Sequence, residues 1–111
     1  MALTPEKKVK NKCVTLIKAY GVYYFFPSMN GFGRSGVPDI ICCVNGKFLG
    51  VECKAGDNKP TELQLLEMSK IRDAGGKTLV VNEVNIGELE ALLKELTNET
   101  RRNEQGSANS P

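Results

Sequence analysis

The sequence predicts an α/β domain in which helices flank a four-stranded mixed sheet, in the order helix, three strands, helix, strand, helix. Three observations support this fold class. Two short apolar runs flank Asn45-Gly46, which is the strongest short-range signal for a two-residue hairpin turn. The compact apolar run at 77–81 follows a helical segment, so a helical crossover brings it into the sheet as a further strand. Amphipathic segments at both ends of the folded part supply the remaining helices.

The chain has 111 residues, which is room for one domain. We expect this domain to span residues 1–97. From residue 98 the sequence turns polar, with Gly, Ser, Asn and Pro near its end, and we expect residues 98–111 to form a disordered tail. A core of this size is small, so formation of a homodimer is a natural way to bury more surface.

Composition excludes several classes of protein. No stretch is apolar over 18 residues, and the N-terminus lacks the apolar region of a secretory signal, so we expect a cytoplasmic protein. The four cysteines include no C-x-x-C pair, and the chain has no histidine, which argues against zinc and a disulfide framework. We expect reduced, mostly buried thiols. The net charge of +2 does not by itself indicate nucleic-acid binding.

The first helix is predicted from Pro5 to about residue 20, with Thr4 as its N-cap and Gly21 after its end. Glu6 lies at the edge of its apolar stripe, either because it has a partner near the sheet or because the helix dipole favours an acid in the first turn. The stripe consists of Val9, Cys13, Leu16, Ile17 and Tyr20. Five lysines of this helix fall away from the stripe. They either form a solvated face or, alternatively, contact DNA phosphates. These lysines are Lys7, Lys8, Lys10, Lys12 and Lys18.

Residues 22–26 are β-prone and lie between Gly21 and Pro27, so we predict the first strand there. Residues 28–37 form a glycine-rich loop. This loop is either a flexible connection or a segment whose glycines let the backbone approach a ligand. In the second case Arg34 is a candidate phosphate contact.

If Asn45-Gly46 is the turn, the hairpin register sets Asp39 opposite Glu52 in a non-hydrogen-bonded pair. Two carboxylates about 5 Å apart repel by about 3 kcal/mol at an effective dielectric constant near 20. Lys54 lies on the same strand face as Glu52 but neutralises one charge only. The surplus negative charge suits a hard divalent cation such as Mg²⁺. The alternative is a pair of solvated charges at a fraying strand end.

A polar loop at 55–60, whose Lys59 is a further candidate contact to DNA, leads into a helix predicted from Thr61 to about residue 74. Gln64 stands three residues after Thr61, the spacing of a capping box, so it either caps the helix or reaches a site beside the hairpin. Residues 77–81 form the last strand. The last helix is predicted from a leucine stripe at Leu89, Leu92, Leu93 and Leu96.

Pro38-Asp39, a gap of twelve residues and then Glu52-Cys53-Lys54 resemble the PD-(D/E)XK nuclease signature. The surrounding residues 36–41 and 61–64 resemble the VRR-NUC (virus-type replication-repair nuclease) branch, and more closely its small stand-alone phage members. The resemblance covers about residues 3–95. It implies a restriction-endonuclease-like core and a Mg²⁺-dependent endodeoxyribonuclease, with Mn²⁺ as a substitute. By resemblance, the metal ligands are Asp39, Glu52, the backbone carbonyl of Cys53, and Glu6.

The same resemblance implies that Lys54 orients the attacking water or stabilises developing charge, and that Gln64 reaches the active site. The stand-alone members resemble dimeric enzymes that act on four-way (Holliday) DNA junctions, so branched DNA and a second copy of the chain are the expected partners. Two enzyme alternatives are a general duplex and a flap endonuclease. Two others lack catalysis: a nucleic-acid-binding domain of this fold, and an interaction module that dimerises through residues 23–26.

Overall fold

The computed structural model describes the backbone of residues 3–27 and 35–106 and the side chains of residues 3–27 and 35–98. Its secondary structure confirms the predicted α/β class and the predicted order of elements. The elements are α1 (Pro5–Ala19), β1 (Tyr23–Phe25), β2 (Ile40–Val44), β3 (Lys47–Cys53), α2 (Glu62–Asp73), β4 (Lys77–Val81) and α3 (Ile86–Gly106).

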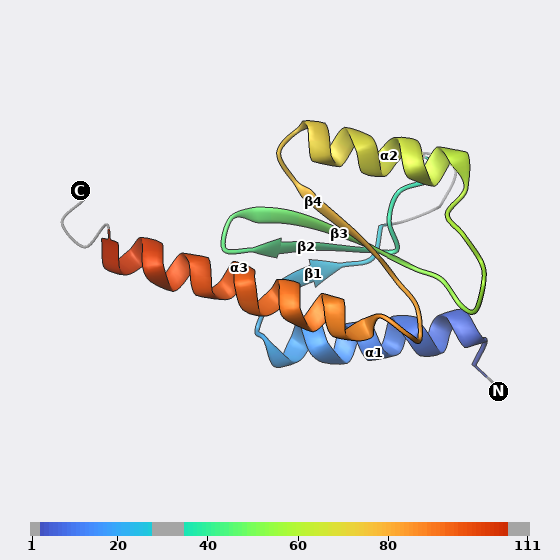
Figure 1. Ribbon diagram of the computed structural model, residues 1–111, viewed down its shortest axis with the longest axis horizontal. Helices are drawn as coiled ribbons and strands as arrows, with labels where there is room; N and C mark the ends of the chain where they lie inside the picture. The colour runs from blue at the N-terminus through green and yellow to red at the C-terminus, as the bar shows by residue number, and fades with distance from the viewer. Residues whose placement is uncertain (1–2, 28–34, 107–111) are drawn as a thin grey trace.

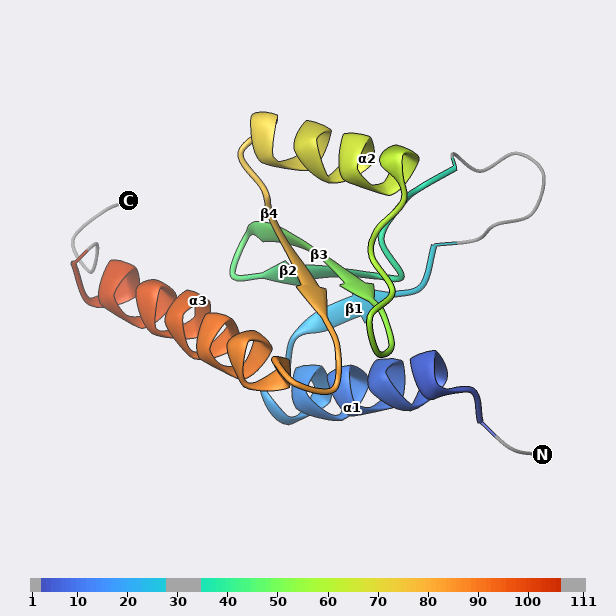
Figure 2. The same ribbon diagram turned by 45° about the vertical axis from the view of Figure 1, so that its right-hand side comes forward.

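The four strands form one mixed sheet in the order β1-β2-β3-β4. β1 and β3 are antiparallel to β2, whereas β4 is parallel to β3 because α2 carries the chain back between them. Helices α1 and α3 lie together on one face of the sheet, and α2 lies on the other face (Figures 1 and 2). The sheet is therefore the middle of three layers.

The hairpin between β2 and β3 has the predicted turn and register. Asn45 and Gly46 both adopt positive φ angles, 55° and 83°, as a type I′ turn requires. The pairing runs from Val44 opposite Lys47 to Ile40 opposite Val51. The turn is fixed to α3 because Asn45 Nδ2 donates a hydrogen bond of 3.1 Å to the carbonyl of Leu96. This register decides which side chains of β3 face each layer.

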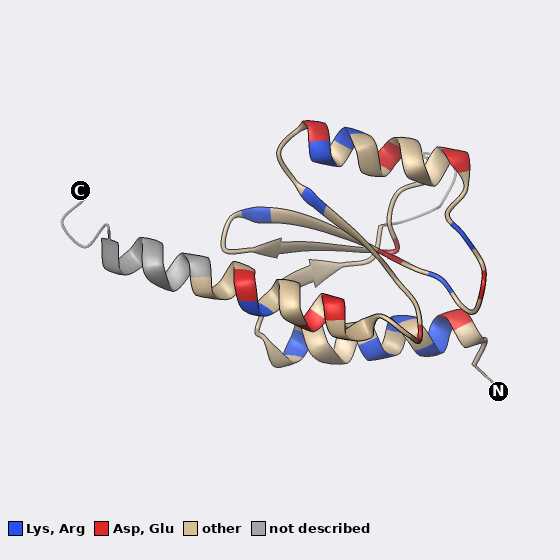
Figure 3. Ribbon diagram, viewed as in Figure 1, with Lys and Arg blue, Asp and Glu red and all other residues tan. Residues whose placement is uncertain are grey.

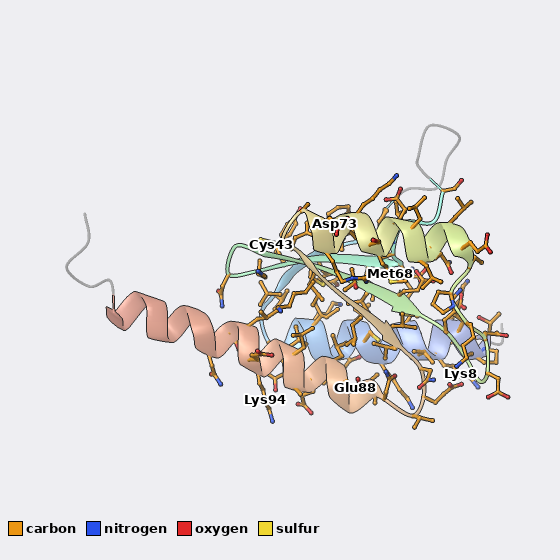
Figure 4. The ribbon with its side chains drawn as sticks, turned by 45° about the horizontal axis from the view of Figure 1, so that its top comes forward. Lys8, Cys43, Met68, Asp73, Glu88 and Lys94 are labelled. Carbon is orange, nitrogen blue, oxygen red and sulfur yellow. The ribbon has the colours of Figure 1, made fainter. Side chains whose placement is uncertain are left out.

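The core lies between the sheet and the helices α1 and α3. Alternate residues of β2 and β3 point into it, so Cys42 is buried while its neighbour Cys43 is exposed. All four cysteines are free thiols and three of them are buried, as predicted. Burial raises the pKa of Cys42 to about 12, which keeps this thiol protonated. On the opposite face, Met68 points from α2 toward the sheet and is also buried (Figure 4).

Two element boundaries differ from the prediction. β1 is shorter and ends at Phe25, two residues before Pro27, which cannot donate a ladder hydrogen bond. α3 continues to Gly106, although we expected the last helix to end before residue 98. No glycine or proline interrupts residues 88–105, so nothing in the local sequence stops the helix. The division into a domain at 1–97 and a tail at 98–111 stays a prediction.

The described helices include none that combines the length and the apolar character needed to cross a lipid bilayer.

Candidate active site

The candidate site lies at the end of the sheet where β2 begins and β3 finishes. Because α1 and α2 both start near this end, their N-termini face it from opposite sides of the sheet (Figures 1 and 2). Three of the predicted residues gather here: Asp39 just before β2, Glu52 in β3, and Lys54 just after β3. The hairpin turn therefore brings them together, although 12 residues separate Asp39 from Glu52 in the sequence.

Asp39 is placed differently from its predicted position. The ladder between β2 and β3 ends at Ile40, so Asp39 lies in a bend and is not paired across from Glu52 within the ladder. Its Oδ2 accepts a hydrogen bond of 2.8 Å from the backbone N–H of Cys53. Beyond Ile40 the strand supplies no acceptor for that N–H, and the carboxylate replaces it. Asp39 thus caps the edge of β3 beside Glu52.

Among the described residues, Glu52 is the charged residue that is buried, with 2% of its surface exposed. Its Oε2 lies 3.3 Å from the ammonium of Lys54, as the shared strand face predicted. Its Oε1 is buried and has no hydrogen-bond partner among the described residues. Burial raises the pKa of Glu52 to about 7, and the negative charge of Asp39 adds to this effect while Lys54 opposes it.

This arrangement fits a divalent cation. A buried carboxylate oxygen without a partner costs free energy, and a cation at that oxygen would remove the cost. Mg²⁺ is commonly bound through one or two carboxylates, with waters and substrate phosphates in its other positions. Within the described parts of the chain, no group of three or more His, Cys, Asp or Glu side chains is placed to hold a metal. The site therefore offers two carboxylates, and substrate and water would have to complete the coordination.

Glu6 is not gathered into this pair. It is exposed in the first turn of α1, whose start is fixed by a hydrogen bond of 3.2 Å from the N–H of Lys7 to Thr4 Oγ1. After burial and Asp39, the charge of Glu6 is a smaller influence that raises the pKa of Glu52. Glu6 therefore affects the ionisation of Glu52 less than Asp39 does.

Gln64 forms the capping box that its spacing allowed. Its Oε1 accepts from the N–H of Thr61 at 2.8 Å, and its own N–H donates to Thr61 Oγ1 at 3.2 Å. This confirms the capping interpretation. A role at the site would use the amide nitrogen of Gln64 or the second lone pair of its amide oxygen, because the cap engages that oxygen through one hydrogen bond.

The segment that delivers Asp39 is held by two close approaches that the sequence did not reveal. Gly36 has a φ of 84°, and a Cβ there would lie 2.6 Å from the carbonyl oxygen of Leu63 in α2. Pro38 packs on β3 so closely that a Cβ at Gly50 would lie 2.8 Å from its Cγ. Gly36 thus approaches the backbone of α2. The other loop glycines and Arg34 lie outside the described residues, and Lys59 is exposed in the loop before α2.

Gly36→Ala is expected to lower the free energy of unfolding by about 2–4 kcal/mol, because strain at positive φ adds to a clash with backbone that cannot turn away. Gly75→Ala is the matched control, since Gly75 has a φ of 95° but nothing within 4 Å of its added Cβ. It should cost about 1 kcal/mol. Urea denaturation of the three proteins measures the difference, and equal losses would show that the contact with α2 is unimportant.

Two of three comparisons with known proteins found similar proteins. No family model matches the sequence. A protein named "Putative nuclease p44", from Acyrthosiphon pisum secondary endosymbiont phage 1, is 34% identical over 91 residues, in an alignment that covers 80% of this chain and 95% of that protein. A solved structure titled "VRR_NUC domain" superposes with a TM-score of 0.66 and 26% sequence identity, over 83% of this chain and 97% of that one.

Proposed function

The chain belongs to the VRR-NUC family of nucleases, and we propose that it hydrolyses DNA phosphodiester bonds with a bound divalent metal ion, Mg²⁺ in the cell. The observation that carries this proposal is the buried, unpartnered Oε1 of Glu52 beside a second carboxylate. A solvated pair of charges at a fraying strand end would leave both acids exposed, whereas Glu52 is 2% exposed.

Asp39, Glu52 and the backbone carbonyl of Cys53 are the proposed ligands of the ion. In an extended strand the N–H and C=O groups of one residue point to the same side. Because the N–H of Cys53 donates to Asp39, its carbonyl is expected at the same edge as that carboxylate. When bound, the ion would lower the pKa of a water molecule and polarise the phosphate.

Lys54 is the proposed electrostatic catalyst. Its ammonium is held 3.3 Å from Glu52 and its side chain is 12% exposed, so the charge is fixed in a partly dry position. A preorganised cation there would orient the attacking water or stabilise negative charge that develops on the phosphate. Glu6 would hold a water molecule or a second ion at the edge of the site. Gln64 would position water or phosphate through its amide nitrogen.

The proposed substrate is branched DNA, with four-way junctions cut by a homodimer. A two-fold dimer presents two sites in the symmetry of a two-fold junction. Tyr23 and Phe25 of β1 are 70% and 47% exposed, which supports this edge strand as a contact between copies. Arg34 and Lys59 are proposed phosphate contacts. A cytoplasmic location, in a host cell if the gene is carried by a phage, agrees with this substrate.

The test is a cleavage panel of labelled four-way junctions, flaps, splayed arms and linear duplexes, each with Mg²⁺, with Mn²⁺ and with EDTA. We expect cleavage with both metals and none in EDTA. The four-way junction should give the highest kcat/KM and should be cut at paired, symmetric positions. Equal cleavage of all substrates would favour a general duplex endonuclease, and preference for flaps would favour a flap endonuclease. DNA binding without cleavage in any metal would overturn the proposal in favour of a non-catalytic domain.

A further inference from the structure

Positive charge is unevenly distributed over the molecule. α1 carries five lysines and one glutamate, whereas residues 86–98 of α3 carry three glutamates and one lysine. Figure 3 shows this contrast as lysines along α1 and acidic residues over the described part of α3. Of the three helices, taken over their described side chains, α1 is therefore the one that would attract a polyanion most strongly.

The lysines of α1 lie on two flanks with different surroundings. Lys8 and Lys12 border the same hollow as Glu83, which follows β4. Both carboxylate oxygens of Glu83 accept from the N–H of Gly56, at 3.0 and 3.2 Å, so this negative charge is fixed beside that flank. A DNA phosphate approaching there would meet a carboxylate as well as the lysines, which weakens the attraction.

The other flank of α1 faces β1. There Lys10 Nζ lies 4.1 Å from the ring centroid of Phe26, a cation–π contact. Phe26 is 49% exposed, and its ring also meets Tyr24 at a centroid distance of 5.8 Å. Lys7 is three residues before Lys10 and therefore on a neighbouring part of the same flank. The aromatic ring holds one ammonium in place at the surface without neutralising its charge.

This flank borders the candidate active site. β1 pairs with β2 up to Phe25 opposite Ile41, so continuing the register by one residue sets Phe26 beside Ile40, the residue after Asp39. Lys10 is also one helical turn beyond Glu6, which lies in the first turn of α1, near the end of the sheet where β3 finishes (Figure 1). Two independent elements, a strand end and a helix turn, thus place Lys10 toward the end of the sheet that carries the site.

We propose that Lys10, held over Phe26 and supported by Lys7, binds a backbone phosphate of the DNA and so guides the strand into the active site along the β1 flank of α1. The proposal rests on the nuclease function proposed above and adds the surface that DNA uses. Phe26 acts as a positioning residue in it, because the ring limits the freedom of the lysine before DNA arrives. Such a contact carries no sequence information.

The test measures binding of a fluorescently labelled four-way junction by anisotropy in EDTA, which does not depend on cleavage, between 50 and 200 mM salt. Lys10→Gln is expected to lower the slope of log affinity against log salt by about 1 and the affinity at 100 mM salt by about 3- to 10-fold. Lys12→Gln, on the other flank, and Lys94→Gln, on α3 (Figure 4), are matched controls expected to bind as wild type. Phe26→Leu should give an intermediate loss.

A second readout separates binding from chemistry. At saturating DNA, the single-turnover cleavage rate of Lys10→Gln should stay within about twofold of wild type, since the variant keeps all the proposed ligands. An unchanged salt slope in Lys10→Gln, equal losses in Lys12→Gln or Lys94→Gln, or a wild-type protein that binds no DNA would overturn the inference. A wild-type protein that shows the predicted pattern of binding but cuts nothing would overturn the proposed function and leave this surface standing.

Discussion

Asp39→Asn is expected to reduce metal-dependent cleavage by about 100-fold or more while the fold stays intact. The substitution removes one of two carboxylates at the proposed metal site but keeps an oxygen that can accept from the N–H of Cys53, the contact now made at 2.8 Å. The loss should therefore appear in the chemistry and not in the structure. Single-turnover cleavage of a junction in Mg²⁺, together with circular dichroism, measures both.

Asp73→Asn provides the control for this substitution, because Asp73 is exposed at the end of α2 (Figure 4) and takes no part in the proposed site. It should cleave at the wild-type rate. An Asp39→Asn protein that cuts normally would remove Asp39 from the mechanism. A protein that fails to fold would show instead that the carboxylate has a structural role at the edge of β3.

The sequence predicted the hairpin well because the relevant physics is local. Asn45-Gly46 favours one turn type, that turn fixes the register, and the register places Glu52 and Lys54 on one face of β3. The parallel β4 followed equally directly from a helix between two strands. The hairpin and the parallel β4 each depend on neighbouring residues or on a rule of topology. Their prediction therefore needs no knowledge of contacts between distant segments.

The parts that could not be predicted depend on contacts between distant segments. The ladder between β2 and β3 ends at Ile40, one residue short of Asp39, and the Asp39 carboxylate therefore accepts from the backbone of Cys53. The role of Gly36 depends on the backbone of Leu63, which lies in another element. For Gln64 the capping spacing was itself the signal, and the structure shows that the local explanation is realised. Glu6 had no local signal that fixes its distance from the site.

The second large effect concerns pH. Without metal, wild-type protein is expected to lose stability as the pH rises from about 4.5 to about 7. The pKa of Glu52 is raised from 4.5 to about 7 in the folded state, first by burial and then by Asp39. Between these values the folded state binds more protons than the unfolded state, so the free energy of unfolding falls with increasing pH. Below this window Glu52 is protonated in both states, and above it Glu52 is ionised in both.

The size of this effect is on the order of 3 kcal/mol, because the pKa of Glu52 rises from 4.5 to about 7 on folding and each pKa unit corresponds to about 1.4 kcal/mol. Glu52→Gln isolates it, because glutamine cannot ionise and this contribution becomes independent of pH. In EDTA, we expect the free energy of unfolding of wild type to fall relative to that of Glu52→Gln as the pH rises from 5 to 8. The change in this difference should equal the amount given above. Urea denaturation at several pH values measures it, and parallel profiles would contradict the raised pKa.

At high pH, a divalent metal ion should restore the stability that the wild-type protein loses when Glu52 ionises. The ionised Glu52 that destabilises the metal-free fold is the form that binds a cation, so Mg²⁺ at 100 times its dissociation constant would add about 2.7 kcal/mol at pH 8. The same addition should stabilise Glu52→Gln far less, and both proteins little at pH 5. If Mg²⁺ and Mn²⁺ do not change the melting temperature of wild type at pH 8, the buried, unpartnered oxygen of Glu52 is not a metal ligand.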